Sequence, residues 1–405
     1  MHDRPGGVVA IACRIAIIFG TRPEGIKLAP VYDEMRRRET LEPVLITTGQ
    51  HREMLGQVCD MFDLEPDVSL DIMRHGQSLG EVTSRALAGL ERALGEQSCE
   101  MALVQGDTAT TFTGAMAGFY HQIRVGHVEA GLRSGNKYSP YPEEVFRRIT
   151  TAIANLHFAA TDGARQNLLR EHIDPGSIFV TGNTVIDALL ATRERSPSLE
   201  DTQFRWLDDI DGRVMLVTAH RRENLGVPFT RICTALARIV ERFEDLHVIF
   251  PMHLNPRVRR AATELLGGID RISLCEPADY VTFVSLMSRA DLILTDSGGI
   301  QEEAPALGVP VLVARETTER PEGIEAGVVR LVGTQTEDIV EAAEELLTSP
   351  TVYARMGGGG SPYGDGHASE RICDALEFVL GMRHSRPREF RYQPASRPNG
   401  REDDG

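Results

Sequence analysis

The sequence lacks a long apolar run, a pair of closely spaced cysteines and an excess of basic residues, and each absence excludes a class of protein. It has no run of about 18 apolar residues, so no membrane-spanning helix is expected. Its six cysteines are scattered, which favours a reduced cytoplasmic protein whose thiols are buried as small hydrophobic groups. The net charge of −16 argues against a nucleic-acid-binding protein, because such proteins draw affinity from a basic surface.

Motifs for cofactors, metals and export are missing as well. No G-x-G-x-x-G fingerprint occurs, so a bound nicotinamide is not expected. Residues 127–129 (HVE) resemble the opening of a zinc deaminase motif, but the P-C-x-x-C partner and any H-E-x-x-H spacing are absent. The apolar segment 7–20 could pass for a signal-peptide core, but Arg14 interrupts it, and we interpret it as a lead-in and a buried strand. We therefore expect no metal and no cofactor.

The sequence does contain a regular alternation of short apolar runs with amphipathic stretches. The apolar runs have the length of buried strands, and the stretches between them have helical spacing. In the first part of the chain, strands are expected at 14–20, 42–48, 100–106 and 123–128, and helices at 26–38, 50–62, 79–94 and 110–122. This pattern predicts an α/β fold with a parallel, doubly wound sheet.

The alternation pauses at a polar, turn-rich stretch, residues 193–213, and then begins again. The second series has strands at 213–220, 246–251, 290–296 and 309–314, and helices at 229–243 and 299–308. We therefore predict two Rossmann-like domains with parallel sheets, a linker near residues 185–212 and a late amphipathic helix at 367–380. The predicted boundaries are 1–184 with 367–384, 185–366, and a disordered tail at 385–405 that lacks apolar periodicity.

Cationic or ionisable side chains follow the first predicted strand of each domain. Arg22 and Lys27 flank a helix start in GTRPEGIK, where free N–H groups favour an anion. His220, Arg221 and Arg222 occupy the matching place in TAHRRENLG. Because open α/β sheets bind ligands at the carboxyl ends of strands, two such domains would present cations to one cleft. The alternatives are a solvated cationic loop for the first group and a structural histidine for His220.

A nucleotide site is predicted from LILTDSGGIQEEAPALG. The small residues Ser297, Gly298 and Gly299 follow a buried strand and open a helix, so backbone N–H groups can approach a phosphate. One turn on, Glu302 and Glu303 can offer a carboxylate to a ribose diol. The alternative is a helix N-cap followed by two surface acids.

Two further residues belong to this prediction. Phe283 in PADYVTFVSLM precedes the strand at 291–295, where it could stack on a base or simply belong to the core. Arg320 in TTERPEG is placed to meet the phosphates, unless it occupies a surface turn.

Acids cluster after strands of the first domain. Asp107 follows one strand, Glu129 ends the next, and the Pro-rich stretch VEAGLRSGNKYSPYPEE leads to Glu143 and Glu144. Individually, Asp107 would serve as a helix N-cap and Glu143 would suit a first helical turn. Together they predict a set of general acids and bases opposite the cations of the second domain.

These stretches, read in order, resemble the bacterial non-hydrolysing UDP-N-acetylglucosamine 2-epimerases over residues 14–382. The motifs that carry the resemblance are FGTRPEGIK, TTGQHREML, QGDTATTF, GHVEAGLRSGNKYSPYPEE, TGNTVIDAL, TAHRRENLG, PMHLNP, TDSGGIQEEAP, TTERPEGIEAG and SPYGDGHASERI. The resemblance implies a glycosyltransferase-B-like fold with the active site in the interdomain cleft, a late helix that crosses back to the first domain, and a homodimer.

The resemblance also implies a role for each candidate residue. Around UDP it places Phe283 near uracil, Glu303 at the ribose, and Ser297, Gly298, Gly299 and Arg320 at the diphosphate. Around the sugar and the scissile bond it places Arg22, Lys27, Asp107, Glu129, Glu143 and His220. For a second, activating UDP-GlcNAc site it points to Gln50, Gln77, Glu143, Arg221 and His253. This chain departs from the family pattern at Glu53, Gly76, Ala109 and Phe146.

The residue types suit epimerisation at C2 of UDP-GlcNAc to UDP-ManNAc. Without a nicotinamide, the remaining route is to expel UDP, remove the C2 proton to give 2-acetamidoglucal, and add UDP back with protonation on the other face. Asp107, Glu129 and Glu143 would share the proton transfers, and His220 with Arg22 and Lys27 would assist departure of UDP. Three alternatives remain: a hydrolysing epimerase that releases ManNAc, a glycosyltransferase of the same fold, and a non-catalytic nucleotide-sugar sensor.

Overall fold

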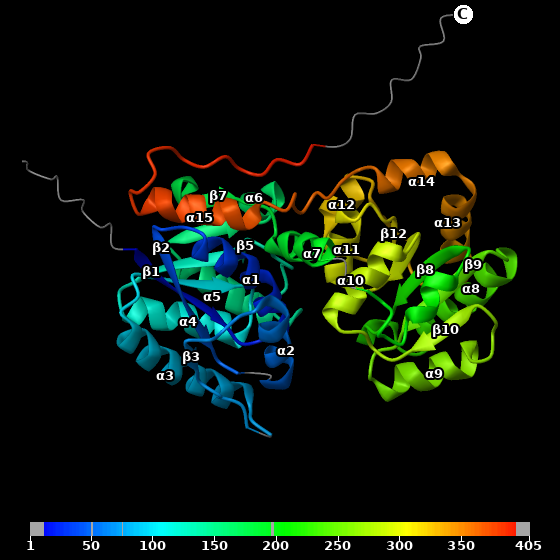
Figure 1. The fold of residues 1–405 in the computed structure, drawn as a ribbon, viewed down its shortest axis with the longest axis horizontal. Helices are drawn as coiled ribbons and strands as arrows, with labels where there is room; N and C mark the ends of the chain where they lie inside the picture. The colour runs from blue at the N-terminus through cyan, green and yellow to red at the C-terminus, as the bar shows by residue number, and fades with distance from the viewer. Residues whose placement is uncertain (1–11, 50–51, 75, 196–197, 394–405) are drawn as a thin grey trace, which may run out of the picture. The chain divides into compact units, whose positions relative to one another are not determined.

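The computed structural model describes residues 12–393, apart from 50–51, 75 and 196–197. The chain forms two compact domains (Figure 1). Of the described residues, the first domain contains those from 12 to Ala188 together with Gly366–Arg391, and the second contains Leu189–Asp365 and residues 392–393. Within the described residues, no helix has the length and apolar character needed to cross a membrane.

The first domain contains a seven-stranded parallel sheet in the order β3-β2-β1-β4-β5-β6-β7. The strands are β1 (Cys13–Phe19), β2 (Leu41–Thr47), β3 (Val68–Ser69), β4 (Met101–Gln105), β5 (Arg124–Ala130), β6 (Leu156–Ala159) and β7 (Ile178–Val180). Residues 15–19 and 101–104 are fully buried, which explains why β1 and β4 are continuous apolar runs without alternation.

Two layers of helices cover this sheet. The helices are α1 (Arg22–Arg36), α2 (Arg52–Phe62), α3 (Leu79–Gln97), α4 (Ala109–Tyr120), α5 (Glu143–Ile153), α6 (Asp162–Arg170) and α15 (Ala368–Val379). Helix α7 (Thr184–Glu194) contains the boundary between the two domains, after Ala188. Helix α1 packs beside α2 and α15, whereas α4 packs between α3 and α5. The late helix α15 therefore returns to the first domain, as the family resemblance implied.

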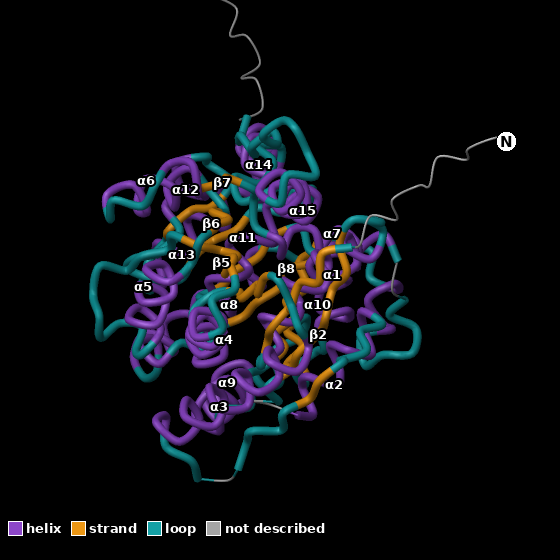
Figure 2. Tube along the Cα trace, turned by 90° about the vertical axis from the view of Figure 1, so that its left-hand side faces the viewer, coloured by secondary structure: helices purple, strands orange, loops and turns teal. Residues whose placement is uncertain are grey.

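The second domain repeats the design with six parallel strands in the order β10-β9-β8-β11-β12-β13. The strands are β8 (Arg213–Thr218), β9 (Leu246–Pro251), β10 (Ile272–Cys275), β11 (Leu292–Thr295), β12 (Val311–Val313) and β13 (Val329–Leu331). The helices are α8 (Val227–Arg242), α9 (Pro256–Leu266), α10 (Tyr280–Arg289), α11 (Gly298–Ala306), α12 (Pro321–Glu325), α13 (Thr336–Thr348) and α14 (Pro350–Gly357). Figure 2 shows the strands in orange among the purple helices.

The prediction of two Rossmann-like domains with parallel sheets is confirmed, and every helix and strand predicted by range is present. The short strands β3, β6, β7, β10 and β13 were not predicted, because two to four residues carry too little periodicity. The range expected as a linker contains most of α7 and a 3₁₀ helix at Arg205–Asp209.

The expectation of a disordered tail from residue 385 is wrong for residues 385–393, which pack on the protein. The backbone N–H of Phe390 donates to the carbonyl of Val180 at 2.8 Å, and its ring is buried. The Arg386 guanidinium stacks over the Phe179 ring at 4.1 Å. Single anchors of this kind leave no periodic signal in a sequence. The rest of the predicted tail, 394–405, lies outside the described residues.

Candidate functional site

Both sheets have a topological switch point, and the predicted site residues gather around these two places. In each sheet the strand order reverses between the first and fourth strands, that is between β1 and β4 and between β8 and β11. Ligands of open α/β sheets bind outside the carboxyl ends of the strands at such a point. Arg22 and Asp107 follow β1 and β4, while His220 and Ser297 follow β8 and β11.

The switch point of the first domain is organised by Glu24, a residue that sequence reasoning missed. Its buried carboxylate accepts hydrogen bonds from the backbone N–H groups of Gly20 and Thr21, at 3.0 and 2.8 Å. It also accepts from the hydroxyls of Thr108 and Thr111, at 2.5 and 3.0 Å. Burial raises its pKa, and these hydrogen bonds oppose the shift. Glu24 thus ties the turn that carries Arg22 to the turn that carries Asp107.

Glu129 is held by donors from three different segments. Lys27 Nζ on α1 lies 2.6 Å from Glu129 Oε1, and the side-chain amide of Asn183 donates to the same oxygen at 3.1 Å. The amide of Gln105, the last residue of β4, donates to Oε2. Glu129 has a φ of 64° at a β-bulge in β5, a conformation that is uncommon for a residue with a side chain. The structure therefore brings Lys27 and Glu129 into direct contact.

Asp107 and Glu144 share a partner on α5, the helix that begins with Glu143. Arg147 bridges the two acids, because its guanidinium donates to Asp107 Oδ2 and, at 3.3 Å, to Glu144 Oε2. Thr108, not Asp107, is the N-cap of α4, so the alternative role for Asp107 as a cap is wrong. Glu143 stands in the first turn of α5, and its Oε2 is buried without a hydrogen-bond partner among the described residues.

Glu144 is a structural carboxylate. It is completely buried, and it accepts hydrogen bonds from the backbone N–H of Ser134 at 3.0 Å and from Arg148 Nε at 3.1 Å. Burial opposes ionisation, but the Ser134 N–H and the charge of Arg147 lower the pKa of Glu144. Of this pair, Glu143 alone has a side-chain oxygen without a hydrogen-bond partner in the described part of the chain.

His220 belongs to a cluster at the end of β8. Its ring stacks on His253 with 5.1 Å between ring centroids, and its Nδ1 lies 3.5 Å from Asp296 Oδ1. Burial lowers the pKa of His220; the Asp296 carboxylate opposes this shift, and His253 and Arg221 add to it. Arg221 Nε donates to the Asp296 carbonyl at 3.2 Å, whereas Arg222 is exposed.

The predicted phosphate site combines the start of α11 with Arg320. Ser297 is the N-cap of α11, and its side chain makes no capping hydrogen bond. A methyl group added at Gly298 would lie 3.1 Å from the Arg320 guanidinium, so the glycine permits this close approach. Arg320 Nε lies 2.6 Å from Glu302 Oε1, and both side chains are largely buried. Glu302 is not a surface acid, and Arg320 is not in a solvated turn.

Glu303 on α11 and Phe283 on α10 are related through Tyr280, which shares α10 with Phe283 and whose pKa Glu303 affects. Burial and the charge of the Glu303 carboxylate raise the pKa of Tyr280, because both favour its neutral phenol. Tyr280 and Phe283 are one turn apart on α10, and the Phe283 ring is half-buried. Gly299 opens the same helix as Glu303, and a methyl group there would lie 3.3 Å from the Glu303 carboxylate.

A family model described as UDP-N-acetylglucosamine 2-epimerase matches residues 33–377. The chain belongs to this epimerase family. Its members are isomerases, and the resemblance inferred from the motifs is confirmed.

Named relatives of the epimerase family cover nearly the whole chain. A Bacillus subtilis UDP-N-acetylglucosamine 2-epimerase is 50% identical over 93% of this chain and 98% of its own length. A Neisseria meningitidis UDP-GlcNAc 2-epimerase, solved with UDP-GlcNAc bound, is 43% identical, with a TM-score of 0.81 over 91% of this chain and 100% of that one. A Staphylococcus aureus protein solved with UDP is 45% identical, with a TM-score of 0.83 over 93% of this chain and 100% of that one.

The glycosyltransferase-B-like fold is confirmed independently of this family. A glycosyltransferase of kitacinnamycin is only 13% identical, yet it covers 91% of this chain with a TM-score of 0.63. That likeness concerns the fold alone.

The residues that the epimerase resemblance assigned to a second nucleotide-sugar site lie in both domains. Gln50 is outside the described residues. The Gln77 side chain makes local hydrogen bonds, since its Oε1 accepts from the Arg74 N–H and its amide donates to the Ile72 carbonyl at 3.2 Å. Arg221 and His253 both neighbour His220. An activating role for these residues stays a prediction.

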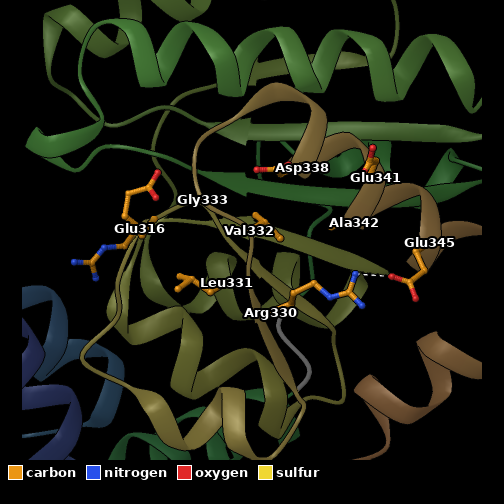
Figure 3. A pocket seen from close by; sticks show the side chains of 10 residues that line it. Glu316, Arg330, Leu331, Val332, Gly333, Asp338, Glu341, Ala342 and Glu345 are labelled. Atoms are coloured by element: carbon orange, nitrogen blue, oxygen red, sulfur yellow. Dashed lines mark hydrogen bonds and ion pairs between the residues drawn. The ribbon is translucent and has the colours of Figure 1, made fainter.

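The second domain also has a shallow pocket of about 500 Å³, which Figure 3 shows from close by. It is lined by Arg315, Glu316, Arg330, Leu331, Val332, Gly333, Asp338, Glu341, Ala342 and Glu345. None of the predicted site residues is among them. Arg330 is already paired with Glu345 at 2.6 Å, and no cluster of described residues has the composition of a metal site. We assign this pocket no ligand.

Proposed function

We propose that this protein interconverts UDP-GlcNAc and UDP-ManNAc without hydrolysis. The observation that carries the proposal is the contrast between Glu129 and Glu143. One carboxylate is fixed by Lys27, Gln105 and Asn183, and the other has a buried oxygen without a hydrogen-bond partner among the described residues. Two acids in unlike surroundings suit a reaction that removes a proton on one face and returns one on the other.

The first half-reaction is an elimination. The bond between C1 and the β-phosphate oxygen breaks with its electrons on UDP, and a carboxylate takes the C2 proton, so that 2-acetamidoglucal, UDP and a protonated acid result. Asp107, Glu129 and Glu143 form the acid–base set. A glucal is a neutral enol ether derivative, so the negative charge to be stabilised resides on the leaving diphosphate.

The departing UDP is stabilised by residues of the second domain, with Arg22 and Lys27 assisting from the first. Ser297, Gly298, Gly299 and Arg320 hold the diphosphate, Glu303 binds the ribose, Phe283 contacts uracil, and His220 donates a proton to the leaving oxygen. The bound UDP and UDP-GlcNAc of the structural relatives support this assignment. In the second half-reaction UDP adds back to C1 as C2 is protonated on the opposite face.

Incubation with UDP-GlcNAc alone in deuterated water tests the proposal. We expect deuterium at C2 of both UDP-sugars and no free sugar in ¹H NMR spectra. Free ManNAc with UDP would show a hydrolysing epimerase instead. Turnover that needs an acceptor would show a transferase, and binding without exchange or turnover would show a sensor.

We also propose a homodimer that works in the cytoplasm. Phe119 and Tyr120 at the end of α4 are 60% and 50% exposed, and such neighbouring aromatic side chains suit a subunit contact. The six cysteines are free, which fits a reducing compartment. Sedimentation equilibrium checks the dimer: twice the 44.6 kDa chain mass is expected, and a concentration-independent monomer would contradict it.

A further inference from the structure

Asp296 is a fully buried carboxylate whose two oxygens have different surroundings. Its Oδ2 accepts three hydrogen bonds, from the backbone N–H groups of His220 at 2.9 Å and Arg221 at 2.8 Å and from the Asn224 side chain at 3.0 Å. Its Oδ1 has no hydrogen-bond partner among the described residues and lies 3.5 Å from His220 Nδ1. A buried acceptor without a partner costs free energy, so this oxygen calls for an explanation.

We propose that Asp296 is a positioning residue for His220. Its free oxygen holds Nδ1 in the protonated state, so that Nε2 on the opposite edge of the ring faces the substrate, and its charge stabilises the imidazolium. This inference rests on the proposed function, because it gives His220 the task of donating a proton to the departing diphosphate. Asp–His pairs of this geometry fix a tautomer in other enzymes without taking the proton themselves.

The geometry makes this orientation specific. Three donors on Oδ2 prevent the carboxylate from rotating, so Oδ1 keeps its direction toward the ring. Two of those donors are the N–H groups of His220 and of its neighbour, so one carboxylate fixes both the backbone and the side chain of His220. The gap of 3.5 Å is longer than an ideal hydrogen bond, and catalytic contacts of this kind shorten when substrate binds.

Burial has the largest effect on the pKa of His220, which it lowers, and the surrounding side chains oppose or add to this shift. Asp296 favours the imidazolium, whereas the stacked His253 and the guanidinium of Arg221 disfavour it. Glu319 lies 3.6 Å from Arg221 and partly offsets its charge. Asp296 is therefore the only one of these groups in direct reach of His220 that supports protonation, and its removal lowers the pKa of His220 further.

The decisive variant is Asp296→Asn, which keeps the shape and an oxygen for the three donors. Its amide would face Nδ1 as a donor and so favour the wrong tautomer. We expect kcat to fall on the order of 10²-fold with KM and UDP affinity changed less than about threefold. The alkaline limb of the kcat profile moves to lower pH, because the donor loses its proton earlier.

A matched control is available on the same strand. Asp291 precedes β11 at the opposite end, and its carboxylate accepts the Val214 N–H at 2.8 Å. Asp291→Asn removes a comparable carboxylate charge at the end of β11 that is remote from His220. The pH profile of kcat in this variant should therefore match that of the wild type. In a double-mutant cycle, Asp296→Asn adds little once His220→Gln is present. Unchanged kcat and pH profile in Asp296→Asn, or full additivity with His220→Gln, would overturn the inference.

A measurement on the wild type keeps the inference testable if the variant does not fold. Long-range ¹H–¹⁵N NMR of the unliganded protein should show His220 as the Nδ1–H tautomer, with the signal assigned from its loss in His220→Gln. The Nε2–H tautomer would overturn the inference. This readout does not depend on turnover, so a protein that fails to epimerise UDP-GlcNAc would contradict the proposed function and leave the tautomer result standing.

Discussion

Lys27 Nζ lies 2.6 Å from Glu129 Oε1, and the two side chains are only 17% and 6% exposed. They come from α1 and from the bulged end of β5, 102 residues apart in the chain. A largely buried ion pair adds little to stability compared with a well-packed apolar pair, but breaking it leaves an uncompensated charge. Its place beside the switch point of the first domain makes function the better explanation for it.

The first prediction concerns this pair. Lys27→Met leaves the Glu129 carboxylate without its cation and removes a charge that assists departure of UDP, so kcat/KM should fall on the order of 10²-fold. Product formation followed by NMR measures the effect. Lys137→Met is the control, because Lys137 is exposed over the Tyr138 ring at 5.1 Å. Equal rates for the two variants would contradict the role of Lys27.

The second prediction separates two adjacent acids. Glu143→Gln should reduce kcat about 10²–10⁴-fold without lowering the melting temperature, because its Oε2 makes no hydrogen bond in the described part of the chain. Glu144→Gln should instead lower the free energy of unfolding by roughly 1.5–3 kcal/mol, since charge-assisted hydrogen bonds from Arg147 and Arg148 are weakened. Kinetics and urea denaturation of both variants check this. The reverse pattern would show that the two roles are exchanged.

The third prediction compares two ion pairs of the same length in the second domain. Arg320→Met leaves Glu302, which is 3% exposed, without its guanidinium, so stability should fall by about 3–5 kcal/mol and UDP should bind more weakly. Arg330→Met breaks the 2.6 Å pair with the 46% exposed Glu345 and should change stability far less, because solvent screens an exposed pair. Urea unfolding and calorimetric titration with UDP distinguish the two. Weakened UDP binding in Arg330→Met would contradict the assigned diphosphate site.

The fourth prediction follows from a buried histidine next to Asp107. His127 Nε2 donates to the Gly106 carbonyl at 2.7 Å, and burial lowers its pKa to about 3. The unfolded chain binds a proton near pH 6.5 and the folded protein does not, so stability is complete above about pH 6.5 and declines between pH 6.5 and about 3. The slope reaches about 1.4 kcal/mol per pH unit for this one proton.

The variant His127→Gln removes this titration and keeps a donor for the Gly106 carbonyl. Its stability should therefore fall less steeply than that of the wild type when urea unfolding is measured at pH 7.5, 6 and 5. His384→Gln, at an exposed position, should keep the wild-type slope. Parallel slopes for all three proteins would show that folding does not lower the pKa of His127.

The fold could be predicted largely from the sequence, because strands and helices leave patterns that span only a few neighbouring residues. Buried parallel strands are continuous apolar runs, as in β1 and β4. In the helices between them, apolar residues recur with the helical period of about 3.6 residues. Glycines and small residues at strand ends marked both switch points. The segment at residues 385–393 was missed because Phe390 and Arg386 are single anchors, each held by one distant partner.

The candidate site could be predicted as a set of residues but not as a set of partners. Glu24 reads as the end of an ordinary capping box, T-x-x-E, and its bonds to Thr108 and Thr111 span more than 80 residues. The adjacent acids Glu143 and Glu144 are indistinguishable in sequence. In the structure, Glu144 is the buried partner of the Ser134 N–H, whereas Glu143 Oε2 has no hydrogen-bond partner among the described residues.

The two parallel sheets, the charged strand ends and the epimerase family follow from the amino-acid sequence, because they depend on short-range pattern and on motifs. The pairing of Glu129 with Lys27, the structural role of Glu144 and the position of Asp296 beside His220 follow from the three-dimensional fold. The physical reason is that a buried polar group must find its partner in space, and strands brought side by side supply partners that lie far away along the chain.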